Sequence, residues 1–470
     1  MNASMTGERL SAREEVIGYV SAIGLSLLSV TAMVLTGGAL SGATALPLLA
    51  MFLVSFLSLR VSLAILMILL FWEHYTSIFT TCVVFAFVFG VSFLWRFRDK
   101  AWREFRNPLG FPLLLYGACV LPSFLNASRP WTSLYMLVFN VGAFIIVLFG
   151  LGASLRTYQS VRFVTIGYLT LTVANAVYIV ALSLSGVARP FGLAGIFIVD
   201  FLGLGTCLAA AMAMVSHGLT RRLLVACSAF IAIALVLTQT RGVWLVSLFT
   251  LIVLVASGIV LAPLLDFSRR SLLATLVVGS CVVVGGGALV VALNPKIESR
   301  ATELTDKSAY GINSQGYTQN SLITRVFIWS SAWSAFQAHP IVGVGVYSFR
   351  WSSREYTELS RTLYDRYVAK LSVHQTHLAV LAETGILGFV GFMVFVTTAL
   401  RHGFRSVSAL CDLRGRRYAF VAAVGLVYCI ASMVITDAWL WGQQIVLLGM
   451  VMGCMTAISR PVWADEAMQP

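Results

Sequence analysis

The sequence predicts an all-α fold: a polytopic bundle of about 12 to 14 transmembrane helices with one large, partly helical extracytoplasmic loop. Hydrophobic residues make up 59% of the 470 residues, and only 11% are charged. The apolar residues lie in runs that approach the roughly 20 residues a helix needs to cross the hydrocarbon core of a bilayer. Residues 294–373 are a long polar stretch between such runs, and they form the predicted loop.

Candidate spans follow one another along the chain, and the polar stretch divides them into two groups. Residues 1–293 hold the N-terminal group, and residues 374–470 hold the C-terminal group. Arg60 interrupts the apolar sequence near the start, so the two segments beside it could also form one tilted or re-entrant helix. The expected spans are 16–36, 43–59, 61–73, 77–95, 109–125, 131–153, 161–185, 190–216, 223–239, 243–263, 271–294, 376–400, 418–435 and 441–458.

Short loops rich in Lys and Arg stay in the cytoplasm, and this rule orients the bundle. When the spans are counted in alternation, the basic loops fall on one side, so both termini are expected in the cytoplasm and the large loop outside it. We interpret the first span as the insertion signal rather than a cleaved signal peptide, because no small-residue cleavage context follows it. The clearest basic loop contains Arg96, Arg98, Lys100, Arg103 and Arg106.

The formal net charge of +13 lies mostly in these basic loops. Anionic membrane lipids are therefore the expected partner of the positive charge, and nucleic acid is not. The eight cysteines are scattered, and none lies in the large loop, so neither a disulfide framework nor a metal site is predicted. The sequence contains no Asp-x-Asp pair, and we expect no metal and no cofactor.

The large loop is expected to be irregular first and helical later. Residues 296–320 are rich in Ser, Thr, Gly, Gln and Asn and have no apolar period. In residues 322–338, Arg325, Trp329 and Trp333 recur at four-residue spacing. This spacing predicts a helix with the arginine and the aromatic side chains on one face.

The second half of the loop contains turn signals and a further helical stretch. Pro340 ends the first helix, and the glycines of Gly343-Val-Gly345 predict a turn. A second helix is expected over residues 352–370, where charges of opposite sign alternate.

Three ionisable side chains frame the loop and suggest work on an anionic substrate. Arg241 precedes it in Thr-Gln-Thr-Arg-Gly, Arg325 lies inside it, and His374 lies where the chain becomes apolar again. Guanidinium groups bind phosphate oxygens bidentately, and an imidazole has a pKa suited to a general base near neutral pH. Plainer interpretations exist for all three: a membrane-interface anchor, part of an amphipathic helix surface, and a residue at a helix start.

Neighbouring side chains also have open interpretations. Trp329 belongs to an aromatic stripe that fits either packing or a platform for a sugar ring, and His377 is an alternative general base. Glu383 lies on the helical face opposite His374, which favours a structural role. Asp437 lies near the end of an expected span, where a carboxylate is either functional or simply hydrated.

Four short motifs follow one another between about residues 230 and 400. They are Thr240-Arg241-Gly242, Arg325 to Trp329 with Ala332, Pro340 to Gly345, and His374 through Leu378 and Glu383 to Gly385. Their order, and their expected side of the membrane, resemble the bacterial O-antigen ligase and polymerase superfamily. The chain departs from the usual pattern in two places. Gln375 follows the histidine where Asn is usual, and Asp200 follows Arg189-Pro-Phe-Gly192 where Asn is usual.

The resemblance implies a membrane glycosyltransferase of the bacterial inner membrane. Such an enzyme moves a glycan from an undecaprenyl-diphosphate carrier to an acceptor hydroxyl at the periplasmic face, with inversion and without a metal. The O-antigen ligase reaction, with a lipid A-core acceptor, is the expected type. A polymerase of O-antigen or exopolysaccharide, with a glycan acceptor, is the alternative. A lipid or solute transporter is a more distant alternative, because the internal repeats and midplane polar residues usual in transporters are not evident.

The resemblance also assigns roles to five residues. Arg241 and Arg325 would bind the diphosphate and stabilise its developing charge, and His374 would take the proton of the acceptor hydroxyl. These three are the expected catalytic residues, and they are expected to converge on one cavity. Trp329 and Arg189 complete the expected substrate-binding set.

Overall fold

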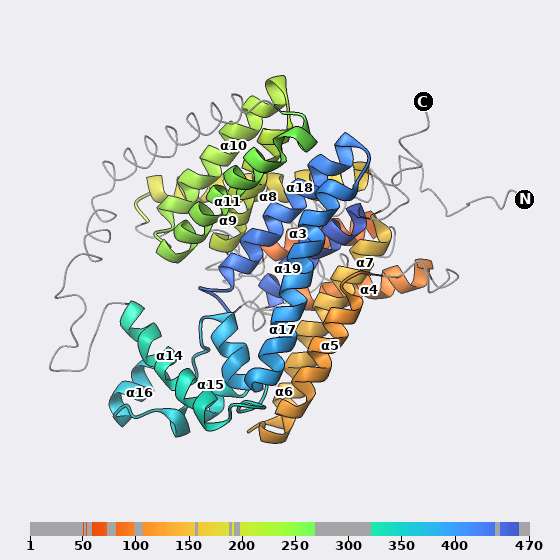
Figure 1. Cartoon of the computed structure of the whole chain (residues 1–470). Helices are drawn as coiled ribbons and strands as arrows, with labels where there is room; N and C mark the ends of the chain where they lie inside the picture. The colour runs from red at the N-terminus through yellow and green to blue at the C-terminus, as the bar shows by residue number, and fades with distance from the viewer. Residues whose placement is uncertain are drawn as a thin grey trace, which may run out of the picture.

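The computed structural model of the chain (Figure 1) is helical throughout its described regular structure. Within the described residues no strand occurs, so the all-α prediction is confirmed there. The described residues are 59–72, 81–97, 107–155, 158–187, 198–267, 321–437 and 442–459, together with positions 50, 53, 190 and 191.

The described helices differ widely in length. Segments labelled η are 3-10 turns, except η4, which is a single π-helical turn. In chain order the helices are α3 (Leu59–Trp72), α4 (Thr81–Phe97), α5 (Gly110–Val120), η3 (Leu121–Asn126), α6 (Pro130–Met136), η4 (Leu137–Val141), α7 (Gly142–Ser154), α8 (Tyr158–Leu184), α9 (Ile198–Val215), α10 (Gly218–Leu237), α11 (Arg241–Leu265), α14 (Ser321–Ala338), α15 (Phe349–Ser352), η6 (Ser353–Tyr356), α16 (Arg361–Tyr367), α17 (Thr376–Ala409), α18 (Leu413–Ser432) and α19 (Gly442–Ile458).

Six helical runs in the described residues are long and apolar enough to cross a membrane, so the chain is a multi-pass membrane protein. The predicted spans 16–36 and 271–294, and nearly all of 43–59, lie outside the described residues. The predicted total of about 12 to 14 spans therefore stays a prediction. The six runs are Pro130–Ser154, Ser160–Leu184, Ile198–Val215, Gly218–Leu237, Arg241–Leu265 and Thr376–Ala409.

The middle of the bundle is α9, whose side chains are almost all buried. Helices α8, α10, α11 and α18 pack around it. Glycines allow this close approach: a Cβ on Gly203 would lie 2.1 Å from the Tyr428 hydroxyl, and a Cβ on Gly205 would lie 2.6 Å from Thr172 Cγ2. Small residues are common at helix contacts in membranes, because lipid supplies no hydrophobic force to press helices together and close packing must do so.

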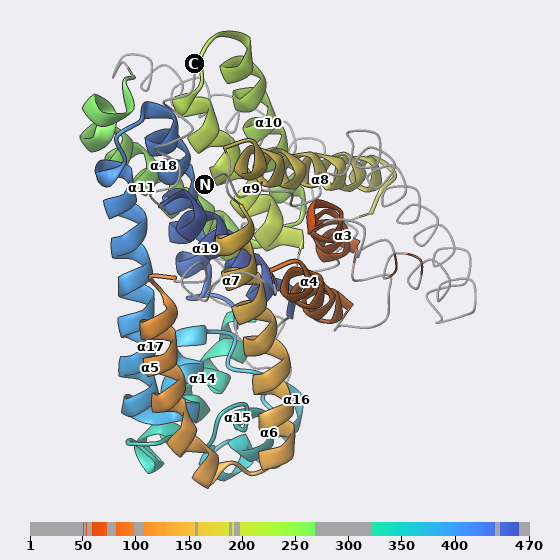
Figure 2. The ribbon, with the colours of Figure 1, turned by 90° about the vertical axis from the view of Figure 1, so that its right-hand side faces the viewer.

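Residues 321–373 form a unit of short helices at one end of the bundle, beside the ends of α17, α5 and α6 (Figures 1 and 2). We call this unit the loop subdomain. It has its own apolar core, which includes Ile328, Ala332 and Phe349. Ala382 of α17 belongs to the same core, so the start of α17 joins the loop subdomain to the bundle.

The two helices predicted in the loop have different outcomes. Helix α14 confirms the predicted helix over 322–338. The continuous helix predicted over 352–370 is wrong, since the structure has η6 and α16 with extended backbone between them. Thr357 has φ −122° and ψ 136°, and the Ser360 hydroxyl accepts a hydrogen bond from the Leu363 amide and starts α16 anew. The alternating charges indicate that the segment is at the surface. They do not indicate whether it forms one continuous helix.

A pair of glycines lets residues 340–345 pass close to a kink in α17, and we call these residues the crossing segment. The helix bends at Gly385, which has φ +62°, and Gly343 in the crossing segment has φ +70°. A Cβ on Gly343 would lie 2.3 Å from the carbonyl carbon of Glu383, and a Cβ on Gly385 would lie 2.3 Å from that of Ile341. Both positions therefore require glycine for conformation and for space.

Backbone hydrogen bonds fasten the crossing segment to α17 on both sides of the kink. They replace the helical bonds that the kink breaks, because the freed amides and carbonyls find partners on the other segment. The bonds run from the Val344 amide to the Ala382 carbonyl at 3.0 Å, from the Gly345 amide to the Glu383 carbonyl at 3.0 Å, and from the Ile386 amide to the Pro340 carbonyl at 2.9 Å.

Candidate functional site

His374 lies in the short connection between the loop subdomain and α17, on a strained backbone. Its φ of +55° is in the left-handed region, which residues other than glycine rarely adopt. The Asp437 carboxylate holds it there: Oδ2 accepts from the His374 amide at 2.7 Å, and Oδ1 accepts from the Gln375 amide at 2.9 Å. Strain of this kind persists where the surrounding contacts over-determine it, and it is concentrated at functional sites.

The turn that carries Asp437, residues 433–437, is bonded to the start of α17 at a second point. The Thr376 amide donates to the carbonyls of Met433 and Thr436 at 2.8 and 3.0 Å, and the Thr376 hydroxyl also donates to Thr436. Asp437 is only 3% exposed, so its carboxylate takes its hydrogen bonds from these amides rather than from bulk water. The turn thus supplies the cap that the first amides of α17 need.

Arg325 lies on α14 within electrostatic reach of both Asp437 and His374. Burial lowers the pKa of Arg325, and Asp437 acts in the opposite direction. Burial also lowers the pKa of His374 below its usual range; Asp437 opposes this shift and Arg325 adds to it. The His374 imidazole is therefore neutral at pH 7, in the form that can accept a proton.

Arg241 is the first residue of α11, and this helix begins beside the same turn. The residue two positions earlier, Gln239, takes a left-handed φ of +56°, which redirects the chain into the helix. A Cβ on Gly242 would lie 3.1 Å from Ile435 Cδ1, in the turn that carries Asp437. The small residue after Arg241 thus lets α11 begin directly against this turn.

The structure brings the three expected catalytic segments together. The start of α11, the Arg325 side chain and the His374 connection all lie around the turn 433–437. That the side chains of Arg241, Arg325 and His374 share one substrate cavity stays a prediction.

Trp329 supports the chain just before His374. Its Nε1 donates to the Val373 carbonyl at 3.1 Å, and its ring packs against the core of the loop subdomain. The indole nitrogen is thus engaged with the protein, and a contact of the ring with substrate stays a prediction. Arg189 lies outside the described residues, so its predicted substrate contact stays a prediction as well.

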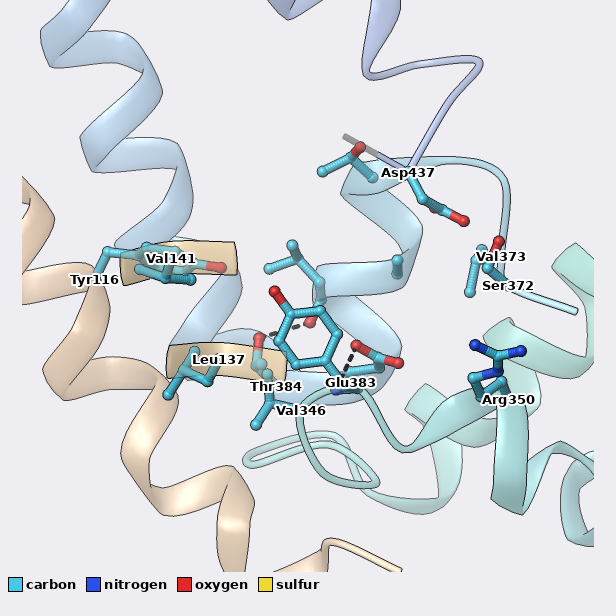
Figure 3. Close-up of a pocket in the computed structure, with 14 residues that line it drawn as sticks. Tyr116, Leu137, Val141, Val346, Arg350, Ser372, Val373, Glu383, Thr384 and Asp437 are labelled. Carbon is cyan, nitrogen blue, oxygen red and sulfur yellow. Dashed lines mark hydrogen bonds between the residues drawn. The ribbon is translucent and has the colours of Figure 1, made fainter. Parts of the chain in front are cut away.

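A cavity borders the His374 connection, with about 640 Å³ of empty space that includes its open mouth (Figure 3). It lies between the loop subdomain, α5, η4 and the start of α17. Asp437 and Thr376 belong to its wall, as does Glu383. The Glu383 carboxylate accepts from the amides of Tyr347 and Phe349 at 2.9 and 3.2 Å, which agrees with the structural role expected for it.

Sequence reasoning missed the part played by Asp437. It recognised a carboxylate near the end of an expected span, but no pattern linked that residue to His374, 63 positions earlier. The available signal was physical: a carboxylate among apolar residues needs donors, and the uncapped start of α17 offers them.

The fold and the site define a class of protein, a multi-pass helical membrane protein with a cationic and imidazole cluster at one end of its bundle. Residues 226–393 match the family model described as O-antigen ligase, and this segment contains Arg241, Arg325 and His374. This match confirms the resemblance of the motifs to the O-antigen ligase and polymerase superfamily. No curated protein matches the chain.

Proposed function

We propose that the chain transfers a glycan from an undecaprenyl-diphosphate carrier to an acceptor hydroxyl, in the manner of an O-antigen ligase. The match of residues 226–393 to the O-antigen ligase family model supports lipid-linked glycan transfer within a membrane. One observation carries the proposal further: Arg325 and a neutral His374 both lie within electrostatic reach of Asp437, at the end of the bundle. A fixed cation and a proton acceptor are what transfer from a diphosphate leaving group requires.

The proposed reaction inverts the configuration of the transferred sugar. The acceptor hydroxyl oxygen attacks the anomeric carbon from the face opposite the diphosphate. The bond between that carbon and the diphosphate oxygen breaks, and its electron pair stays on the departing undecaprenyl diphosphate. The hydroxyl proton passes to His374, whose lowered pKa keeps the imidazole neutral before the step.

Arg241 and Arg325 bind the diphosphate and stabilise the negative charge that it gains. A guanidinium suits this task because its planar fork binds two phosphate oxygens at once. Trp329 and Arg189 complete the proposed substrate-binding set, Trp329 through the face of its ring. In the part of the chain that the structure describes, no three His, Cys, Asp or Glu side chains gather where they could hold a metal ion.

The proposed transfer is independent of divalent metals, and chelation tests this directly. The purified protein is assayed with and without a strong chelator, and the expected rates are equal. Restoration of a lost activity by added magnesium or manganese would show that a metal, and not the arginines, supports the leaving group.

The proposed orientation places the loop subdomain in the periplasm and both termini in the cytoplasm. A single cysteine introduced at exposed Glu355 should react with a membrane-impermeant maleimide in intact spheroplasts. A cysteine at exposed Arg405, near the other end of α17, should react only after the membrane is opened. The reverse pattern would invert the proposed topology.

Deletion of the gene distinguishes the ligase reaction from the polymerase alternative. Loss of long glycan from lipopolysaccharide, with accumulation on the carrier, indicates the ligase. A product with a single repeat indicates the O-antigen polymerase, and loss of secreted polymer alone indicates an exopolysaccharide enzyme. The purified protein should transfer glycan in detergent without any gradient, which a transporter would not do.

A further inference from the structure

The cavity of Figure 3 contains fixed donors without a protein partner. Among the described residues, Arg350 Nε and Ser372 Oγ are buried and accept or donate no hydrogen bond, and both residues belong to the cavity wall. The rest of the Arg350 side chain is held in place. One terminal nitrogen donates to the Lys370 carbonyl at 3.2 Å, and the guanidinium lies 4.9 Å from the centre of the Trp351 ring. Buried donors are normally paired, so these two are available to a molecule that enters the cavity.

The cavity wall also supplies acceptors. Glu383 and Asp437 both belong to the wall, and each carboxylate is fixed by backbone amides. Figure 3 shows the Glu383 and Arg350 side chains apart from one another. Fixed donors and fixed acceptors therefore line the same space.

The wall combines hydrogen-bond donors and acceptors. It contains the Arg350 guanidinium and the Ser372 hydroxyl together with the carboxyl groups of Glu383 and Asp437. A sugar hydroxyl suits this combination, because it can accept from Arg350 or Ser372 while it donates to Glu383. The cavity thus differs in chemistry from the arginine pair proposed for the carrier.

The third wall is apolar and belongs to the π-helical turn η4. Leu137 and Val141 face the cavity, while Val138 of the same turn is 52% exposed. The turn is tied to the loop subdomain because Asn140 hydrogen-bonds the side chain of Tyr347, which itself has a left-handed φ of +56°. Isolated π turns of this kind are frequent at functional sites.

The helices beside η4 point to a membrane-anchored ligand. Phe111, Leu114, Leu125 and Trp131, on α5, η3 and α6, are at least 75% exposed, as expected for side chains that face lipid. The cavity is thus separated from this apolar surface by a single layer of helices. A sugar carried on a lipid can present its ring to the cavity while its tail stays in the bilayer.

We propose that this cavity is the acceptor subsite, which binds the terminal sugar of a membrane-anchored glycan and presents its hydroxyl to His374. Arg350 and Ser372 donate to the sugar, and Glu383 accepts from it. The apolar wall of η4 lies along the ring. This inference rests on the proposed transferase function, and it separates the acceptor from the carrier, which binds at Arg241 and Arg325.

A matched pair of substitutions in η4 tests the subsite by kinetics. Val141→Phe narrows the cavity, whereas Val138→Phe adds the same bulk on the exposed side of the same turn. With the acceptor glycolipid that supports transfer by the wild-type protein, Val141→Phe should raise the acceptor KM at least about tenfold and leave undecaprenyl diphosphate affinity unchanged. Ser372→Ala, which removes one hydrogen bond, should raise the same KM about three- to tenfold. Val138→Phe should match the wild type.

A binding measurement keeps the inference testable if no transfer is found. The protein is purified in a detergent that contains no sugar. Dodecyl maltoside, a lipid-tailed disaccharide, is then added, and its retention by the protein is measured by native mass spectrometry. Retention should fall in Val141→Phe and Ser372→Ala and persist in Val138→Phe. Equal retention in all three would overturn the subsite, and so would a loss of undecaprenyl diphosphate binding in Val141→Phe. If the wild type transfers no glycan, the proposed function fails while this measurement still decides the cavity.

Discussion

The bundle and the loop subdomain use glycine for different purposes. In α9, Gly203 and Gly205 have ordinary helical backbone, and their small size lets neighbouring side chains approach. Where the loop subdomain crosses α17, Gly343 and Gly385 have positive φ, so both their size and their conformational freedom are required. Glycines in the bundle therefore serve close packing, whereas glycines beside the site also allow an unusual backbone conformation.

Residues other than glycine follow this division in part. Among the described residues, Tyr347, Lys370 and His374 have positive φ and lie in the loop subdomain or at its junction with α17, whereas Gln239 and Asp266 have positive φ beside the two ends of α11. Backbone of this kind costs roughly 1 to 3 kcal/mol per residue, so the bonds from Asp437 and Glu383 must hold it. The difference teaches that a substitution at a strained position near the site changes both conformation and packing, while one at a helical glycine of the bundle changes packing alone.

The largest expected effect is the loss of the proposed base. His374→Asn keeps a residue that tolerates left-handed backbone but removes the proton acceptor, so transfer should fall about 10²- to 10⁴-fold. Binding of undecaprenyl diphosphate should be retained, because the imidazole acts on the acceptor hydroxyl. Initial rates and carrier affinity are measured side by side.

A distant histidine provides the control for this substitution. His402 lies near the other end of α17, where its Nε2 bonds to the Ser459 hydroxyl, and His402→Asn should keep nearly full activity. Full activity in His374→Asn would remove the general-base assignment.

The second effect is the loss of the planar fork on the proposed diphosphate clamp. Arg325→Lys and Arg241→Lys keep the charge but lose bidentate binding, so each should lower kcat by about 10²-fold with normal expression. Arg361→Lys is the matched control, because this arginine is 87% exposed and pairs only loosely with Asp365. Unchanged turnover and carrier binding in both site variants would exclude the clamp.

The third effect separates conformation from packing in the crossing segment. Gly343→Ala should destabilise the protein by about 2 kcal/mol or more, because positive φ alone costs roughly 1 to 2 kcal/mol for a residue with Cβ and a clash with Glu383 adds to it. The melting temperature in detergent measures this. Gly117→Ala in α5, where nothing lies within 4 Å of the added Cβ, should be neutral or slightly stabilising. Equal melting temperatures for the two variants would contradict the argument.

These glycines also show how far the sequence could predict the fold. Hydropathy identified the six membrane-long helical runs of the described residues, and four-residue spacing identified α14, because both signals are local in the sequence. The motif around Gly343 and Gly385 was recognised without its reason, since the two positions meet only after α17 bends. The helix predicted over 352–370 failed for a related reason, because charge alternation is compatible with any exposed backbone.

The sequence likewise predicts part of the candidate site and not the rest. Arg241, Arg325 and His374 could be selected from residue type and motif order. The turn 433–437, around which their segments lie, could not be predicted, because Asp437 meets His374 through backbone amides that no side-chain pattern encodes. The acceptors and donors of the cavity were likewise missed, since Arg350 and Ser372 are typical surface residues by sequence.

A smaller effect concerns pH. Burial and the nearby Arg325 lower the pKa of His374, so the neutral base persists to lower pH and the acid limb of the rate profile should have its midpoint below about 6.5. Removing the cation with Arg325→Gln should move that midpoint upward, because a contribution that lowers the pKa is lost. The residual activity of the variant is measured from acid to neutral pH. A midpoint that moves downward would contradict the proximity of the two side chains.

The smallest expected effect distinguishes support from sugar stacking at Trp329. Trp329→Phe keeps an aromatic ring but removes the hydrogen bond to the Val373 carbonyl, which contributes about 1 kcal/mol and holds the chain next to His374. We therefore expect kcat to fall about fivefold while the affinities for carrier and acceptor stay unchanged. Trp333→Phe is the control, since this neighbouring indole is 49% exposed on the same helix. Full kcat in Trp329→Phe would exclude the supporting hydrogen bond. Unchanged substrate affinity in Trp329→Leu would exclude the proposed contact between the ring and the substrate.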